Sequence, residues 1–308
     1  MQIVKDLEKL SLDGKCAVAI GKFDGIHIGH QALLKQIIQK KEEGMYAVVF
    51  TFSPSPEEFF RGQILPAIDT LEEKRENFRQ MGVDILIEYP LNKKSAAISP
   101  EDFMQKILFE RLNAGYVVSG TDLSFGNKGL GNSKMLAAFA KEHGFLYEMI
   151  DKICLDGMEV SSTAVRNAIM EGDMELVSKM LGREYRIGGE VVHGKALGRT
   201  IQVPTINVIP DRQKLIPKKG VYATITQLDD RYLKGITNIG CKPTVSNTME
   251  VGAETHLFDF DEDVYGRQVV TSLLHFIRPE IQFSDLDGLV KQLEQDCVNG
   301  KAYFVDNF

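Results

Sequence analysis

Short apolar runs alternate with helical patterns over roughly the first 180 residues. Residues 15–21 (KCAVAIG) form a continuous apolar run that ends in glycine, which is typical of a strand buried on both faces of a parallel sheet. Strands alternating with helices predict an α/β fold with a parallel sheet and helices on both faces. Further strands are expected at 45–52, 83–88, 116–119 and 145–150, and helices at 31–40, 71–81, 99–113 and 134–142.

The pattern changes near residue 183. Turn-forming Gly, Pro, Asn and Asp residues now separate short strand-like runs, which predicts a small antiparallel β-barrel. A final helix is expected over about residues 284–298. We therefore predict two domains, residues 1–183 and residues 184–308. The strand-like runs lie at 187–193, 221–227, 232–239, 255–260 and 268–276.

Length and composition agree with this division and exclude several classes of protein. A chain of 308 residues suits two domains, and 44% hydrophobic residues suffice for a core in each. No apolar run reaches the roughly 18 residues of a membrane span, and residues 1–12 lack the apolar run of a signal peptide. We therefore expect a soluble, cytoplasmic protein without a membrane partner. Its oligomeric state is left open.

The charge of the chain argues against one class of partner, and the spacing of its cysteines argues against disulfides and zinc. The net charge is −7 and no long basic run occurs, which argues against a nucleic-acid partner. The cysteines are widely separated, so disulfides and a zinc site are not expected. They are Cys16, Cys154, Cys241 and Cys297.

A histidine-containing segment, GKFDGIHIGH at residues 21–30, follows the first predicted strand and opens the first helix. Ligands of open parallel sheets bind at the carboxyl ends of strands, and a helix N-terminus offers free N–H groups to phosphate. His27 and His30 share one helix face, and Gly29 leaves the backbone accessible. The segment thus predicts a triphosphate site whose imidazoles stabilise charge at the α-phosphate, rather than an ordinary helix cap with surface histidines. Further candidates for phosphate contact here are Gly21, Phe23 and Asp24.

Two more segments are expected at the same sheet edge. In VSSTAVR (residues 160–166), Ser162 and Thr163 precede a helix whose first turn carries Arg166, which suits binding of the leaving pyrophosphate. Taken alone, the segment is more often an N-cap with a surface arginine, and the nearby HxGH motif favours the phosphate site. In GTDLSFGNKG (residues 120–129), Asp122 is a candidate contact for a ribose or flavin hydroxyl, although an ordinary glycine-rich loop explains the segment too.

The second half carries its own candidate site. Residues 186–199 (RIGGEVVHGKALGR) read as a strand entering a glycine-rich loop, and PTIN follows at 204–207. Thr205 and Asn207 offer neutral oxygens suited to Mg²⁺ that also contacts ATP phosphates. Glu254 is a candidate base for a primary hydroxyl group. Each of these residues alone has a plain structural explanation, a cap or a solvated strand end.

Taken together, these motifs resemble the bacterial bifunctional riboflavin kinase/FMN adenylyltransferase family over about residues 2–300. The GxFDGxHxGH, GxDxxFG and SSTxxR segments resemble its FAD synthetase part, and GxVxHGxxxGR, PTxN and RPE (278–280) resemble its riboflavin kinase part. The resemblance implies a Rossmann-like HxGH nucleotidyltransferase domain followed by an antiparallel β-barrel kinase domain with a C-terminal helix. It also implies ATP and Mg²⁺ as cosubstrate and metal, with riboflavin, FMN and FAD as substrates and products.

The resemblance assigns roles to individual residues. His27, His30, Arg166 and Glu254 are implied as catalytic, and Thr205 and Asn207 as metal and phosphate ligands. The loop over 189–199, with Gly194 and Gly198, is implied to cover the nucleotide. Residues implied to contact flavin are Pro56, Asp122, Phe125 and Arg278.

The sequence also departs from the family pattern. Ser55 stands where the family has the histidine of Pro-His-Pro, which questions flavin binding there. Gln202 and Val203 stand where the family favours Gly and Phe, a change that concerns loop packing and leaves the metal and base positions intact.

Two alternatives remain. A non-catalytic or monofunctional flavin-binding relative with one degenerate site is compatible with Ser55. A class I aminoacyl-tRNA synthetase also uses an HxGH-type helix, but that reading lacks a basic RNA-binding surface and leaves the C-terminal motifs unexplained.

Overall fold

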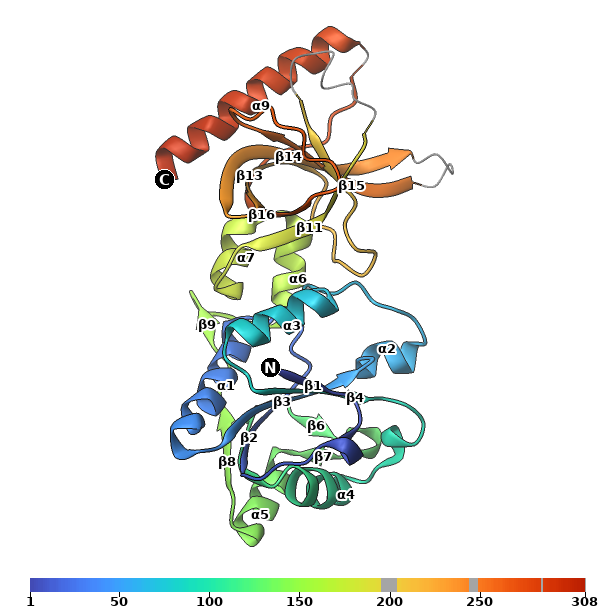
Figure 1. Cartoon of the computed structure of the whole chain (residues 1–308), viewed down its shortest axis with the longest axis vertical. Helices are drawn as coiled ribbons and strands as arrows, with labels where there is room; N and C mark the ends of the chain where they lie inside the picture. The colour runs from blue at the N-terminus through green and yellow to red at the C-terminus, as the bar shows by residue number, and fades with distance from the viewer. Residues whose placement is uncertain (195–203, 244–248, 284, 308) are drawn as a thin grey trace. The chain divides into compact units, whose positions relative to one another are not determined.

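The structure, a computed structural model, describes residues 1–194, 204–243, 249–283 and 285–307 (Figure 1). The chain divides into two compact units, Met1–Ser162 and Thr163–Phe308. The domain boundary between residues 183 and 184 stays a prediction.

The first unit contains a six-stranded sheet in the order β1-β4-β3-β2-β5-β8, and every neighbouring pair is parallel (Figure 1). This confirms the predicted parallel sheet. Strand β1 has only three residues, too few to show a periodic pattern, and was not predicted. The strands are β1 (Gln2–Val4), β2 (Cys16–Ile20), β3 (Tyr46–Ser53), β4 (Ile85–Pro90), β5 (Ala114–Gly120) and β8 (Leu146–Ile150).

Alternate residues of the central strands belong to two different cores, as expected for a sheet covered on both faces. On one face Val18 packs in a cluster with Leu108 and Leu136. On the other, Ala19 packs with Leu34 and Phe78. The helices are α1 (Ile28–Gln39), α2 (Pro56–Arg61), α3 (Leu71–Gln80), α4 (Pro100–Asp102, continued as a π-helix over Phe103–Arg111) and α5 (Ser133–His143).

Smaller elements connect these layers. Two short hairpins pair β6 with β7 and β9 with β10. Their bounds are β6 (Ser124–Phe125), β7 (Gly131–Asn132), β9 (Cys154–Leu155) and β10 (Met158–Glu159), and 3₁₀ turns occupy Leu7–Lys9, Lys40–Glu43, Ser95–Ala97 and Asn127–Gly129.

The second unit is built on a closed antiparallel barrel in the order β11-β12-β15-β14-β13-β16, which confirms the predicted barrel (Figure 1). Helix α7 contacts β16 and β11, and α9 contacts β13, β14 and β16. The elements are α6 (Ser162–Glu171), α7 (Met174–Leu181), β11 (Tyr185–Val192), β12 (Ile206–Val208), β13 (Gly220–Leu228), β14 (Arg231–Pro243), β15 (Met249–Leu257), β16 (Gln268–Pro279) and α9 (Leu286–Asn307).

A row of buried threonines links adjacent strands of the barrel. The Thr237 hydroxyl group lies 2.9 Å from that of Thr224 and 2.8 Å from that of Thr255. All three residues are at most 1% exposed. Because a hydroxyl group both donates and accepts, these buried hydroxyl groups can form hydrogen bonds with one another without water.

Helix α9 is anchored to the barrel by apolar contacts. Phe304 packs with Val221, Ile236 and Phe258, and a side chain at Gly300 would collide with Ile236. The helix therefore reaches Asn307, beyond the predicted end at 298.

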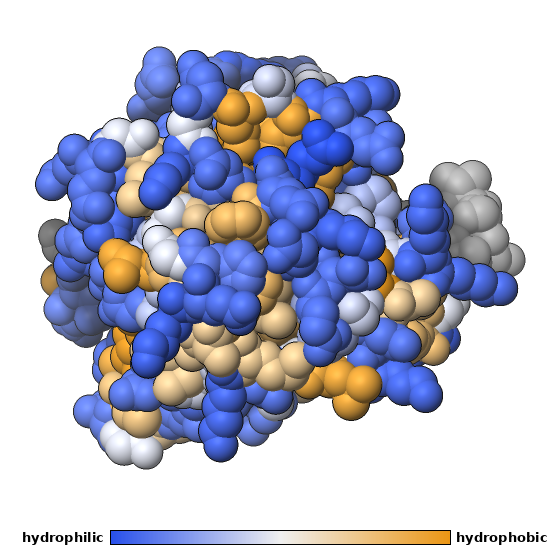
Figure 2. All heavy atoms as spheres, turned by 90° about the horizontal axis from the view of Figure 1, so that it is seen from below, coloured by the Kyte–Doolittle hydropathy of each residue, from blue (hydrophilic) through white to orange (hydrophobic). Residues whose placement is uncertain are grey.

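The outer surface is mixed in character. No helix within the described ranges combines the length and apolar content needed to cross a membrane. Polar side chains cover most of the face drawn in Figure 2, with smaller apolar patches between them. Such scattered apolar groups are ordinary on surfaces in contact with water.

Candidate functional site

The loop between β2 and α1 has an unusual backbone. Phe23 (φ 51°) and Ile26 (φ 40°) adopt the left-handed conformation although neither is glycine. Gly25 adopts it too (φ 80°), and a Cβ atom there would lie 2.8 Å from the Ile68 side chain. Left-handed non-glycine residues cost about 1–3 kcal/mol each and persist only where their surroundings hold them.

Neighbouring segments hold this loop through polar contacts. The Ile68 N–H group donates to the Asp24 carboxylate over 3.1 Å. The carbonyl oxygen of Lys22 accepts hydrogen bonds from the Lys74 ammonium group, 2.6 Å away, and from the Thr51 hydroxyl group, 3.3 Å away. The loop conformation is thus set by long-range contacts as well as by its own sequence.

His27 and His30 stand together at the start of α1. His27 is the N-cap, and its Nδ1 accepts a 3.4 Å hydrogen bond from the His30 N–H group. The two rings stack with centroids 3.8 Å apart. Gly29 lies between them, and a Cβ atom there would approach the His27 ring to 3.1 Å. The predicted phosphate loop and histidine pair therefore form one local structure.

Both imidazoles lose basicity in this position. Burial lowers the pKa of His27 to about 4, with Asp24 partly opposing the effect. Burial, then the neighbouring His27 and Lys74, hold the pKa of His30 well below its ordinary value. Both rings are therefore neutral at pH 7 and offer an N–H donor or a ring-nitrogen acceptor. In the described part of the chain, the buried Nδ1 of His30 has no hydrogen-bond partner, so it is the polar atom that a ligand would satisfy.

The SSTxxR segment (residues 161–166) contacts this loop through its second serine. The Ser162 hydroxyl group donates a 2.9 Å hydrogen bond to the Asp24 carbonyl oxygen. Thr163 and Arg166 lie on α6 in the second compact unit. Phosphate contacts for Ser162, Thr163 and Arg166 stay predictions.

The proposed flavin contacts of the first unit have other partners here. Asp122 is largely exposed and forms a 2.7 Å ion pair with Lys152. Phe125 is 3% exposed and packs against Phe103, with ring centroids 5.2 Å apart. These contacts do not bring Asp122 or Phe125 to the histidine pair.

Ser55 has a clear local function. It is the N-cap of α2, where its hydroxyl group accepts from the Glu58 N–H group and the Glu58 carboxylate accepts from the Ser55 N–H group. Pro56 is the first residue of that helix. Replacing a Ser cap by Ala typically costs about 1 kcal/mol, so a structural reason suffices for the serine.

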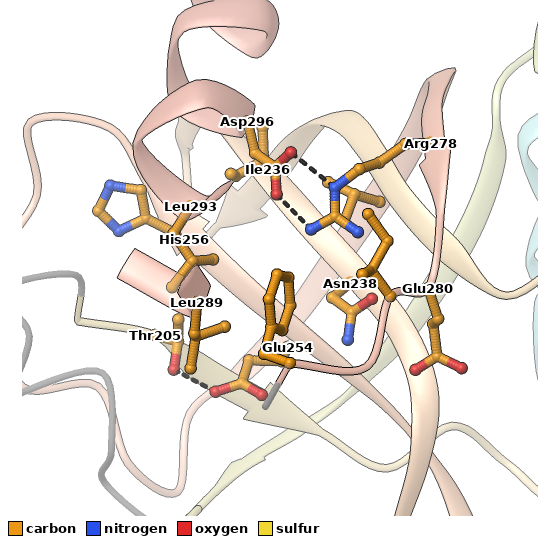
Figure 3. A pocket seen from close by; sticks show the side chains of 13 residues that line it. Thr205, Ile236, Asn238, Glu254, His256, Arg278, Glu280, Leu289, Leu293 and Asp296 are labelled. Atoms are coloured by element: carbon orange, nitrogen blue, oxygen red, sulfur yellow. Dashed lines mark hydrogen bonds and ion pairs between the residues drawn. The ribbon is translucent and has the colours of Figure 1, made fainter. Parts of the chain in front are cut away.

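In the second unit, a cavity of about 260 Å³ lies between barrel strands and α9 (Figure 3). Ile236, Leu289 and Leu293 form part of its apolar wall. Thr205 and Glu254 lie in the lower part of the view, and Arg278 and Asp296 lie in its upper part (Figure 3). An apolar slot with a few polar groups at its margins suits a flat heteroaromatic ligand.

Two of the predicted metal and base residues, Thr205 and Glu254, line the cavity, and Asn207 lies beside Glu254. The Thr205 hydroxyl group donates to a Glu254 carboxylate oxygen, and Asn207 pairs directly with Glu254 across β12 and β15. Gly194 packs so closely on the Asn207 amide that any side chain at 194 would collide with it. Gly198 lies outside the described residues. The neutral oxygens of Thr205 and Asn207, next to a carboxylate, are a donor set that fits Mg²⁺ completed by phosphate oxygens.

Arg278 lines the same cavity but is already held by α9. Its guanidinium group donates two hydrogen bonds, of 2.7 and 2.6 Å, to the Asp296 carboxylate and a third, of 2.9 Å, to the Pro279 carbonyl oxygen. Asp296 is fully buried and also accepts from Gln292. Such a bidentate pair fixes the plane of the guanidinium group.

Comparison with known proteins gives one matching family for each of the two candidate sites. The family model described as FAD synthetase matches residues 9–164, and the one described as riboflavin kinase matches residues 181–304. Proteins named bifunctional riboflavin kinase/FMN adenylyltransferase are 38% identical in Haemophilus influenzae, over 99% of both chains, and 34% identical in Escherichia coli K12, over 99% of this chain and 98% of the relative. The chain belongs to this bifunctional family.

A solved structure shares the whole fold. A crystal structure described as a macrolide-efflux protein from Streptococcus pneumoniae is 27% identical, with a TM-score of 0.86, and the match covers 96% of each chain.

In this member of the riboflavin kinase/FMN adenylyltransferase family, sequence reasoning missed two charged residues near the sites. Lys74 carries no local signal of its own, because its contact with Lys22 spans 52 positions. Asp296 had a usable signal, because it follows Leu289 and Leu293 at helical spacing, on the stripe that should be apolar. A carboxylate on such a stripe indicates a buried partner.

Proposed function

We propose that this chain phosphorylates riboflavin to FMN in the second unit and adenylylates FMN to FAD in the first. One observation carries the proposal. The FAD synthetase match spans the histidine loop, and the riboflavin kinase match spans the cavity with Thr205 and Glu254. Each predicted chemistry thus has its own set of candidate residues within one of the two matched ranges.

The kinase step is a phosphoryl transfer from ATP. The primary hydroxyl group of riboflavin attacks the γ-phosphorus atom, the bond to the β-phosphate oxygen breaks, and ADP leaves. Glu254 accepts the hydroxyl proton, and Thr205 orients the carboxylate through its hydrogen bond. Thr205 and Asn207 would hold Mg²⁺, which offsets charge on the ATP phosphates.

The adenylyl step needs no covalent enzyme intermediate. A phosphate oxygen of FMN attacks the α-phosphorus atom of a second ATP, and pyrophosphate leaves. This nucleophile is ionised at pH 7, so no general base is required. His27 and His30 contribute hydrogen bonds from neutral rings, and Thr163 and Arg166 hold the pyrophosphate.

Flavin contacts are proposed at both sites. Arg278 and the apolar wall of the cavity would contact riboflavin, whose ring is flat and whose carbonyl groups accept hydrogen bonds. Pro56, Asp122 and Phe125 remain the proposed contacts for FMN, with Ser162 supporting the phosphate loop. A cytoplasmic location and the lack of a nucleic-acid partner stay predictions.

The test separates the two activities within one chain. The protein is incubated with riboflavin, ATP and Mg²⁺, and the flavins are separated by chromatography. We expect FMN and then FAD. His30→Ala should form FMN without FAD, whereas Glu254→Gln should form FAD from added FMN but no FMN from riboflavin.

The outcome distinguishes the rival functions as well. Loss of both activities in either variant would contradict the two-site model. A wild-type protein that binds flavin without converting it would be a non-catalytic relative, and one that forms a single product would be monofunctional.

A further inference from the structure

Lys74 on α3 contacts the phosphate loop but has no part in the chemistry proposed above. Its ammonium group lies 2.6 Å from the Lys22 carbonyl oxygen, and Lys22 immediately precedes the left-handed Phe23. A charged donor makes this hydrogen bond stronger than a neutral one. The Thr51 hydroxyl group, at 3.3 Å, is the longer and weaker contact on the same oxygen.

This contact governs the backbone beneath His30. The Lys22 carbonyl group and the Phe23 N–H group belong to one rigid peptide plane. Fixing the oxygen therefore restricts the torsions on both sides, including the positive φ of Phe23. The Phe23 ring is fully buried and packs against His30, with ring centroids 5.1 Å apart. A shift of the Lys22–Phe23 peptide would therefore move the Phe23 ring, and with it the His30 imidazole that packs against this ring.

The charge of Lys74 also acts on the site directly. Burial lowers its pKa to about 8, while the carboxylates of Asp24, Asp69, Glu88 and Glu58 partly oppose that effect. Lys74 is also close enough to His30 to disfavour protonation of that ring. A cation here favours an anion at the loop just as it disfavours a second cation.

We propose that Lys74 is a positioning residue for adenylyl transfer, which holds the Lys22 carbonyl group so that the loop and His30 keep their geometry and whose positive charge favours the ATP triphosphate. The inference rests on the proposed function of the first unit. It predicts weaker ATP binding, more than slower chemistry, when the ammonium group is lost.

The experiment measures FAD formation from FMN at varied ATP for three variants. Lys74→Met, which keeps the length and removes the charge, should raise the KM for ATP about tenfold, with a smaller change in kcat. Lys74→Arg should restore most of the affinity. Lys41→Met is the matched control, because Lys41 also donates to a backbone carbonyl group, that of Gly82 at 3.1 Å, before strand β4 begins. Its KM should match that of the wild type.

A pH series gives a readout that a purely structural role would not move. Raising the pH through about 8 removes the charge of Lys74, so the wild-type KM for ATP should rise there. Lys74→Arg should show no such rise, because arginine stays charged. His27 and His30 do not titrate in this range, since their pKa values are lowered.

Clear results would overturn the inference. The inference is wrong if Lys74→Met has the same KM for ATP and the same kcat as the wild type. It is also wrong if the KM for ATP of Lys74→Arg is as high as that of Lys74→Met. If Lys74→Met does not fold, identical pH profiles for wild type and Lys74→Arg would refute the proposal. A wild type that forms no FAD would instead refute the proposed function, and the inference with it.

Discussion

The hydroxyl group of Thr205 donates a 2.7 Å hydrogen bond to the carboxylate of Glu254, a residue 49 positions later in the chain. This bond holds the Glu254 carboxylate in a defined orientation at the cavity. We expect Glu254→Gln to lower kcat for FMN formation about 10²- to 10⁴-fold, because an amide cannot act as the base. Steady-state kinetics with riboflavin checks this, and unchanged FAD formation from FMN is the control. An active Glu254→Gln kinase would exclude Glu254 as the base.

The close approach of Gly29 to His27 gives a second prediction. Alanine is the better helix former by about 1 kcal/mol, so Gly29→Ala should not lower the free energy of unfolding. Its methyl group would nevertheless meet the His27 ring at 3.1 Å and displace it. We expect FAD formation to fall about tenfold or more while FMN formation is kept. Lys35→Ala, at an exposed position of the same helix, is the control. Unaltered FAD formation in Gly29→Ala would mean that the ring position is unimportant.

Buried His27 should make the first unit sensitive to acid. Its pKa is about 4 in the folded state and about 6.5 in the unfolded chain, so the unfolded state takes up the proton first. The contribution of neutral His27 to the free energy of unfolding is fully present above about pH 6.5 and is lost as the pH falls toward 4. The slope for one such group approaches about 1.4 kcal/mol per pH unit.

Urea unfolding at several pH values measures this slope. His27→Asn keeps a good helix cap without a titrating ring, so it should depend less on pH over the same range. Equal slopes for wild type and variant would assign the acid sensitivity to other groups.

The Arg278–Asp296 pair makes a prediction about the barrel. Asp296→Ala would leave the guanidinium group without its buried partner, at a cost of about 3–5 kcal/mol. The double replacement Arg278→Met with Asp296→Leu should recover most of that stability but not the affinity for riboflavin. Urea unfolding and the riboflavin KM test the two parts. A double variant as unstable as Asp296→Ala would show that the charge pair is not the cause.

The sequence predicted the elements with strong local signals. The run at 15–21 became β2, and the HxGH segment does open α1. Strand β12 was missed because Ile206–Val208 is too short to show alternation. The end of α9 was misplaced because Gly300 reads as a stop signal, whereas here it allows the helix to approach Ile236.

The site residues divide in the same way, into those that belong to local motifs and those whose contacts depend on tertiary packing. Segments such as 21–30 and 204–207 carry their chemistry within a few residues and could be found from the sequence. The contact of Lys74 with Lys22 depends on how α3 packs beside the loop, which no local pattern encodes. The same holds for the other contacts of Asp122 and Phe125, which arise from tertiary structure.

The threonine row of the barrel has a consequence for cooperativity between strands. The middle hydroxyl group, on Thr237, serves two neighbours, whereas the one on Thr224 is linked within this row to Thr237 alone. A valine in the middle would interrupt both links, and a valine at Thr224 only one. Thr237→Val should therefore lower the free energy of unfolding more than Thr224→Val does, and side-by-side denaturation curves would reveal the difference. The stability of the barrel wall therefore depends more on the hydroxyl group of Thr237, which bonds to two strands, than on that of Thr224.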